Sequence, residues 1–184
     1  MATRGGLIAI GGPPLGGRGP LAAMVADSLA RTVKLETVDT LTRETFSSGT
    51  RQRVVGSAAM ESLVAAAVKH LQTTRPRPIV IAVARFEKPA DRALAARAAE
   101  ALGVRFLYVE ARSSNIRSIR RLFKLLGPDL DPVRQIVVHE AAVRRYRAVR
   151  SDEAVALPCV VLSSVLRDLD AACLAVCNAW YGRS

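Results

Sequence analysis

Short apolar-rich runs alternate along the chain with segments whose apolar residues recur at helical spacing. The runs at 7–10, 33–38, 78–84, 104–109 and 155–162 predict five strands. The segments that follow them predict helices at 20–30, 57–71, 89–102, 116–126, 132–149 and 166–180. This alternation is typical of a parallel sheet covered by helices on both faces, so the sequence predicts an α/β protein.

The first predicted strand runs into a loop rich in glycine and proline, Gly12-Pro13-Pro14-Leu15-Gly16-Gly17-Arg18-Gly19. Its spacing follows the phosphate-loop outline G-x-x-x-x-G-K-[ST], in which glycines let backbone N–H groups point at phosphate. Arg18 stands in place of the lysine, and Gly19 in place of the hydroxyl that holds Mg²⁺. The same residues are also compatible with a plain turn between a strand and a helix.

From Leu7 onward, with the loop included, the chain resembles the small P-loop kinases of the nucleoside-monophosphate-kinase-like group, particularly bacterial AAA-family kinases related to zeta toxins. The matching segments are 12–20, 38–46, 79–92 and 101–106. The resemblance implies a three-layer P-loop NTPase fold with a five-stranded parallel sheet flanked by helices. Among the five predicted strands it implies the order second, third, first, fourth, fifth. The nucleotide- or phosphate-binding residues that it implies are Gly12, Gly17, Arg18, Gly19, Arg117, Arg120 and Arg121.

One departure from the family pattern decides the expected function. Relatives carry an acidic residue on the third strand that orders Mg²⁺, and this chain has Val83 there. With the loop lysine and hydroxyl also replaced, we expect a non-catalytic protein that binds a partner or an anionic ligand, within a larger assembly or alone, and no ATP or Mg²⁺ as cofactor. The alternative is an active ATP-dependent small-molecule kinase with Asp39 as general base, although Asp39 is also a suitable strand-end or cap residue.

Composition adds a charge argument and predicts a single domain spanning residues 1–184. Lys and Arg number 27 against 16 Asp and Glu, a net charge of +11. Ten of the basic residues but only three acids lie between 112 and 150, which predicts a basic, lid-like helical region. We expect it to contact a protein or another anionic partner through Arg120, Arg121, Lys124, Arg144, Arg145 and Arg147. A third hypothesis makes this region an RNA- or ribonucleoprotein-binding scaffold.

The cysteines and the chain's hydropathy bound the remaining possibilities. Three cysteines without CxxC spacing favour neither a disulfide framework nor a zinc site, and Cys173 and Cys177 fit the apolar stripe of the last helix. No metal site is expected. No apolar run is long enough to span a membrane, and the N-terminus lacks a signal-peptide pattern, so we expect a reducing, cytoplasmic compartment.

Overall fold

The computed structural model describes residues 5–13, 15–37, 52–54, 59–112, 137, 140, 141, 143, 144, 159–163 and 165–182. The predicted helix at 116–126 lies outside the described residues. Of the helix predicted at 132–149, the five described residues are helical.

A parallel sheet forms the centre of the molecule, with strand order β3-β2-β4-β1-β5-β6. Every neighbouring pair in it is parallel. The strands are β1 (Gly6–Gly11), β2 (Thr32–Thr37), β3 (Gln52–Val54), β4 (Ile79–Val83), β5 (Arg105–Ala111) and β6 (Cys159–Leu162).

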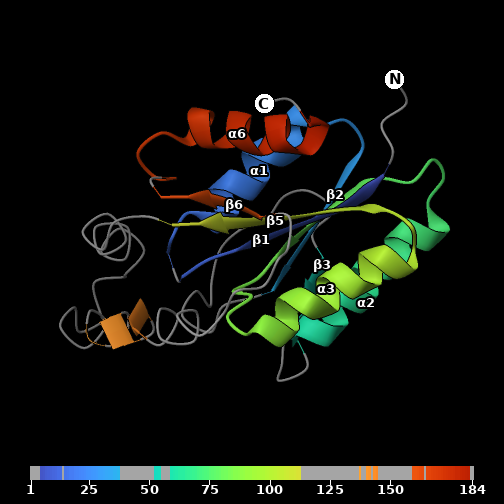
Figure 1. Ribbon diagram of the computed structural model, residues 1–184, viewed down its shortest axis with the longest axis horizontal. Helices are drawn as coiled ribbons and strands as arrows, with labels where there is room; N and C mark the ends of the chain where they lie inside the picture. Colours follow the sequence, from blue (N-terminus) through green and yellow to red (C-terminus); the bar gives the residue numbers. More distant parts are fainter. Residues whose placement is uncertain are drawn as a thin grey trace.

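Helices cover both faces of this sheet and complete three layers (Figure 1). On one face lie α1 (Arg18–Ser28) and α6 (Leu169–Tyr181), which pack against each other. On the other lie α2 (Ala59–Thr73) and α3 (Pro89–Ala101). Among the described residues, no helix is long and apolar enough to cross a membrane.

The predicted strands are all present, and their order β2-β4-β1-β5-β6 is the one implied by the resemblance. The structure adds a sixth strand to the five that the sequence predicts. Gln52–Val54 form the short edge strand β3, paired with β2 from Leu35↔Gln52 to Thr37↔Val54. The apolar pattern could not reveal it, because a three-residue edge strand is held by backbone hydrogen bonds to one neighbour.

Burial on both faces explains why the central strands are apolar throughout. Every residue of β1 and β4 is buried. Alternate residues of each strand enter different cores: Ile10 and Val83 pack on the α1 and α6 side, whereas Ala9 and Ala82 pack on the α2 and α3 side. Because the strands are parallel, their carboxyl ends meet at one edge of the sheet, where the glycine-rich loop begins.

Three arginines donate hydrogen bonds to backbone carbonyls at helix C-termini. Arg75 Nη1 donates to the carbonyl of Leu71 in α2, at 3.3 Å, and Arg77 Nη1 donates to Leu102 at the end of α3, at 3.2 Å. Arg105 Nη2 donates to Ala179 in α6 at 3.0 Å. Cations at helix C-termini complement the helix dipole. Part of the chain's positive charge therefore stabilises helix ends and is not directed at a ligand.

Candidate functional site

The glycine-rich loop connects β1 to the N-terminus of α1. Three of its described residues have positive φ: Gly12 (141°), Leu15 (57°) and Gly17 (101°). The amide of Gly16 donates to the carbonyl of Pro13 at 3.1 Å, which closes a tight turn. Gly17 is the N-cap of α1 and has no side chain to cap it, so the partial positive charge of the helix terminus is turned toward the loop.

The loop is packed closely against the ends of neighbouring strands. The carbonyl oxygen of Ala111, the last residue of β5, lies within 3.0 Å of the positions that Cβ atoms would occupy at Gly12 and Gly16. A Cβ at Gly17 would meet Val165, which follows β6, at 2.9 Å. The amide of Gly12 donates to the carbonyl of Arg85 at 3.2 Å. Only glycine fits at these positions, so the loop glycines serve its packing as well as its turns.

Arg18, Gly19 and Pro20 form the first turn of α1. Arg18 is half-buried, and its Nη1 atom is fully buried. Gly19 supplies no hydroxyl and Pro20 no N–H, so this helix start offers a cation and fewer donors than a phosphate loop with serine or threonine would.

Val83, the residue that the resemblance aligns with a magnesium-ordering acid, faces the core. It pairs in register with Ile10 of β1, and its side chain is 3% exposed within the apolar cluster beneath α1. Among the described residues, no group of three or more His, Cys, Asp or Glu side chains could hold a metal ion. Within the described part of the chain, the residues at this position and in the loop therefore do not fit the magnesium site of a P-loop kinase.

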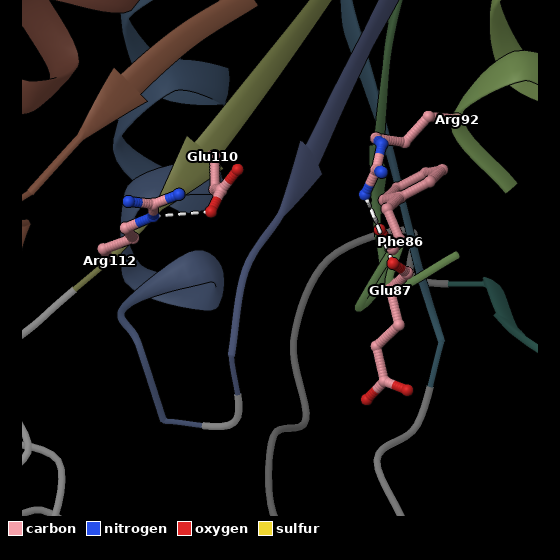
Figure 2. A network of polar contacts seen from close by, with 5 residues as sticks. All are labelled: Phe86, Glu87, Arg92, Glu110 and Arg112. Atoms are coloured by element: carbon pink, nitrogen blue, oxygen red, sulfur yellow. Dashed lines mark hydrogen bonds and ion pairs between the residues drawn. The ribbon is translucent and has the colours of Figure 1, made fainter. Parts of the chain in front are cut away.

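A buried ion pair, not anticipated from the sequence, lies at the carboxyl end of β5. Glu110 pairs in register with Gly11 of β1 and is 0% exposed. Its Oε1 accepts a hydrogen bond from Nε of Arg112, whose side chain is 44% exposed (Figure 2). In parallel α/β folds, ligands bind outside the carboxyl ends of the strands. A charged residue at that end of a strand next to β1 was therefore the signal that could have pointed to Glu110.

The turn after β4 is held rigidly beside the loop. Arg92 of α3, which is buried, donates from Nη1 to the carbonyls of Phe86 at 2.8 Å and Glu87 at 3.3 Å (Figure 2). Phe86 has a positive φ of 48°, and Arg85 Nη1 pairs with Glu87 at 3.1 Å. These contacts fix the Arg85 carbonyl that receives the Gly12 amide.

Tyr108 fills the space beneath the start of the loop. Its ring packs edge-on against Phe86, with centroids 6.1 Å apart, and the guanidinium carbon of Arg92 lies 5.8 Å from its ring centroid. Its hydroxyl lies against Gly11, is buried, and has no hydrogen-bond partner within the part of the chain that the structure describes. The ring thus supports the loop, and the hydroxyl contributes no visible bond.

The structure brings together some of the sequence-predicted site residues. Gly12, Gly17, Arg18 and Gly19 share one loop and helix start. Arg144, of the predicted partner surface, is exposed. The remaining candidates lie outside the described residues: Asp39, Arg117, Arg120, Arg121, Lys124, Arg145 and Arg147. Cys173 and Cys177 pack in or against the α1 and α6 core, as predicted.

Strand order, parallel sheet and loop position together define the class: the chain has the nucleotide-kinase-like P-loop NTPase fold. It is similar to Kti12 of Chaetomium thermophilum in complex with ADP-AlF3, with a TM-score of 0.60, 15% identity and coverage of 96% of this chain and 97% of that one. It is also similar to the APS kinase CysC of Mycobacterium tuberculosis in complex with AMPPNP and APS, with a TM-score of 0.58, 17% identity and coverage of 97% and 98%.

A third similar structure is APE1195, with a TM-score of 0.58, 18% identity and coverage of 97% of this chain and 94% of that one. No family model and no curated protein matches the sequence. At these identities the likeness shows the fold alone.

Proposed function

We propose that this protein binds an anionic ligand at the Gly12–Gly19 loop and does not transfer phosphoryl groups. The observation that carries the proposal is the setting of Val83. Its side chain belongs to the apolar core beneath α1, so β4 has no metal-ordering carboxylate at this position. Phosphoryl transfer depends on the positioning of metal and charge, and here β4 lacks the carboxylate and the loop lacks the hydroxyl.

Anion binding needs fewer groups than catalysis, and those groups are retained. Arg18 keeps a permanent positive charge in the first turn of α1, and the helix terminus adds its partial charge. The loop remains tightly packed on Ala111 and Val165, so it is preorganised. These features support a protein that holds an anion without reacting with it.

A turnover assay tests the proposal. The protein is incubated with Mg²⁺-ATP, and phosphate release and phosphoryl transfer to small-molecule acceptors are followed, with Arg18→Ala as the control for contaminating activity. We expect the same background rate from both proteins. Mg²⁺-dependent transfer by the wild type that is lost in Arg18→Ala would overturn the proposal.

One observation favours a second function, ATP-dependent phosphoryl transfer with an unusual site. Glu110 places a carboxylate at the carboxyl end of the strand next to β1, where a catalytic acid could serve. Its pairing with Arg112 argues against this role, because the carboxylate is already neutralised. If the assay detects transfer, loss of that transfer in Glu110→Gln would assign the activity to this residue.

The basic region at 112–150 is proposed to bind an anionic protein partner. Its support is the excess of ten Lys and Arg over three acids in the sequence, and the exposure of Arg144. Reversal of Arg120, Arg121, Arg144 and Arg145 to Glu should abolish capture of that partner at physiological salt. Capture as strong as that of the wild type would refute the proposed binding surface. If the wild type captures single-stranded or duplex RNA rather than a protein, the scaffold hypothesis is favoured instead.

A further inference from the structure

Glu110 creates an electrostatic requirement at the edge of the sheet. Its side chain is 0% exposed, and the residue pairs in register with Gly11, one residue before the loop starts. A buried carboxylate is costly unless a cation compensates it at hydrogen-bonding distance. The fold therefore specifies a positive charge at this point.

Arg112 meets that requirement and is fixed by it. Its Nε donates a hydrogen bond to Glu110. Its backbone is also held, because its amide donates to the carbonyl of Leu162 at 2.8 Å and its carbonyl accepts from the amide of Val165 at 3.1 Å. Nε is the guanidinium atom that bonds to Glu110, and the Arg112 side chain is 44% exposed. Its two Nη groups are thus presented to solvent as a preorganised fork of donors.

The fork begins beside the phosphate loop. Arg112 directly follows Ala111, whose carbonyl oxygen contacts both Gly12 and Gly16. Arg18 approaches the same loop from the start of α1. Arg112 and Arg18 thus belong to the two segments that border this short stretch of backbone, the end of β5 and the start of α1.

We propose that Arg112 supplies, from within the protein, the positive charge that P-loop kinases obtain from Mg²⁺. The loop then binds the diphosphate unit of a small molecule without a divalent cation, and Glu110 acts as a positioning residue for Arg112. This inference rests on the proposed anion-binding function of the same loop.

The chemistry of the two arginines selects the ligand class. A guanidinium can bind a phosphate bidentately, and two of them acting together with the N-terminus of α1 would match adjacent phosphoryl groups with several negative charges. A nucleic-acid backbone offers single charges at separated diesters and fits this short loop less well. We therefore assign a terminal diphosphate, as in a nucleoside diphosphate or inorganic pyrophosphate.

Calorimetric titration with inorganic pyrophosphate tests the inference, first in excess EDTA and then in excess Mg²⁺. We expect wild-type binding in EDTA, with no gain on adding Mg²⁺. Arg112→Ala should weaken it about tenfold or more. Arg97→Ala is the matched control, because it removes the same charge from an exposed position of α3, and it should bind as the wild type does.

Since Arg112→Ala leaves a buried carboxylate without its partner, the double variant Arg112→Ala with Glu110→Gln provides a neutral pair whose fold is checked by circular dichroism. Glu110→Gln alone should weaken binding about threefold while keeping its salt dependence, because Arg112 is charged but no longer fixed. The double variant should bind no more weakly than Arg112→Ala. An additional loss there would show a structural effect of Glu110 and overturn its positioning role.

The outcomes separate the inference from the function on which it rests. Wild-type binding in EDTA that Arg112→Ala leaves unchanged would overturn the inference and leave the anion-binding function standing. Binding that appears only with Mg²⁺ and is accompanied by ATP turnover would overturn both, as would the absence of pyrophosphate binding in either condition.

Discussion

The carbonyl oxygen of Ala111 lies against Gly12, closer than 3.0 Å to the point that a Cβ would occupy there. This contact joins the end of β5 to the first glycine of the loop. It ties the shape of the loop to the strand that carries Glu110.

Gly12→Ala should therefore destabilise the protein strongly. The new methyl group would collide with backbone atoms, which cannot move without disturbing β5, and Gly12 also has a positive φ of 141°. Gly103→Ala is the matched control, since Gly103 has a φ of 59° but nothing within 4 Å of its Cβ position.

The control should cost about 1–2 kcal/mol of unfolding free energy from backbone strain alone. Gly12→Ala should cost at least about 2 kcal/mol more, measured by urea denaturation. Equal losses in the two variants would mean that Ala111 does not approach Gly12 as described.

Tyr108→Phe should increase the free energy of unfolding by about 1 kcal/mol. The variant keeps the ring contacts to Phe86 and Arg92 and removes a buried hydroxyl that has no partner among the described residues. Removing an unsatisfied buried polar group is neutral or stabilising, whereas removing a bonded one is destabilising. Thermal and urea unfolding give the sign, and a clear loss of stability would show that the hydroxyl has a partner.

The sequence predicted the central strands well because burial on both faces makes them apolar throughout. The run at 78–84 became β4 and the run at 7–10 became β1, each within one residue at either end. Their order came from the resemblance to P-loop kinases, because periodicity carries no information on which strands are neighbours.

The ion pair was missed for a physical reason. An apolar pattern ends β5 at Val109, since a charged residue normally marks the end of a buried strand. Instead the strand continues to Ala111, because Glu110 and Arg112 are two residues apart, share a face and compensate each other. Pairs of opposite charge at this spacing, directly after an apolar run, are the signal that would have found the site.

Val83→Asp tests whether this position can reach the loop. An unpaired carboxylate in the core beneath α1 should cost several kcal/mol near neutral pH. Burial would raise the pKa of the introduced carboxyl above its unfolded value of about 3.9, so the deficit should grow as the pH rises above that value and shrink as the pH falls toward it.

Val83→Thr is the control, because it adds a polar group of similar volume without a charge and its deficit should not depend on pH. Added Mg²⁺ should restore neither variant. Recovery of the Val83→Asp protein in Mg²⁺ would place position 83 at the loop and contradict the apolar setting of Val83.

Titration of Cys177 should lower the free energy of unfolding at alkaline pH. Desolvation by burial, the nearby charge of Cys173 and a hydrogen bond with it raise the pKa of the Cys177 thiol from 9.0 to about 11. The unfolded chain therefore releases this proton between pH 9.0 and about 11 while the folded protein retains it. Stability is unaffected by this group below pH 9.0 and falls as the pH rises through that window.

Unfolding of the wild type and Cys177→Ala, measured from pH 7 to 11, isolates this contribution from the other titrating groups. We expect parallel stability curves up to about pH 9, and a steeper fall for the wild type above it. Since the thiolate is the reactive form, iodoacetamide at pH 8 should modify exposed Cys159 well before Cys177 in the folded protein. Equal alkylation rates at the two cysteines, or parallel curves up to pH 11, would contradict a raised pKa at Cys177.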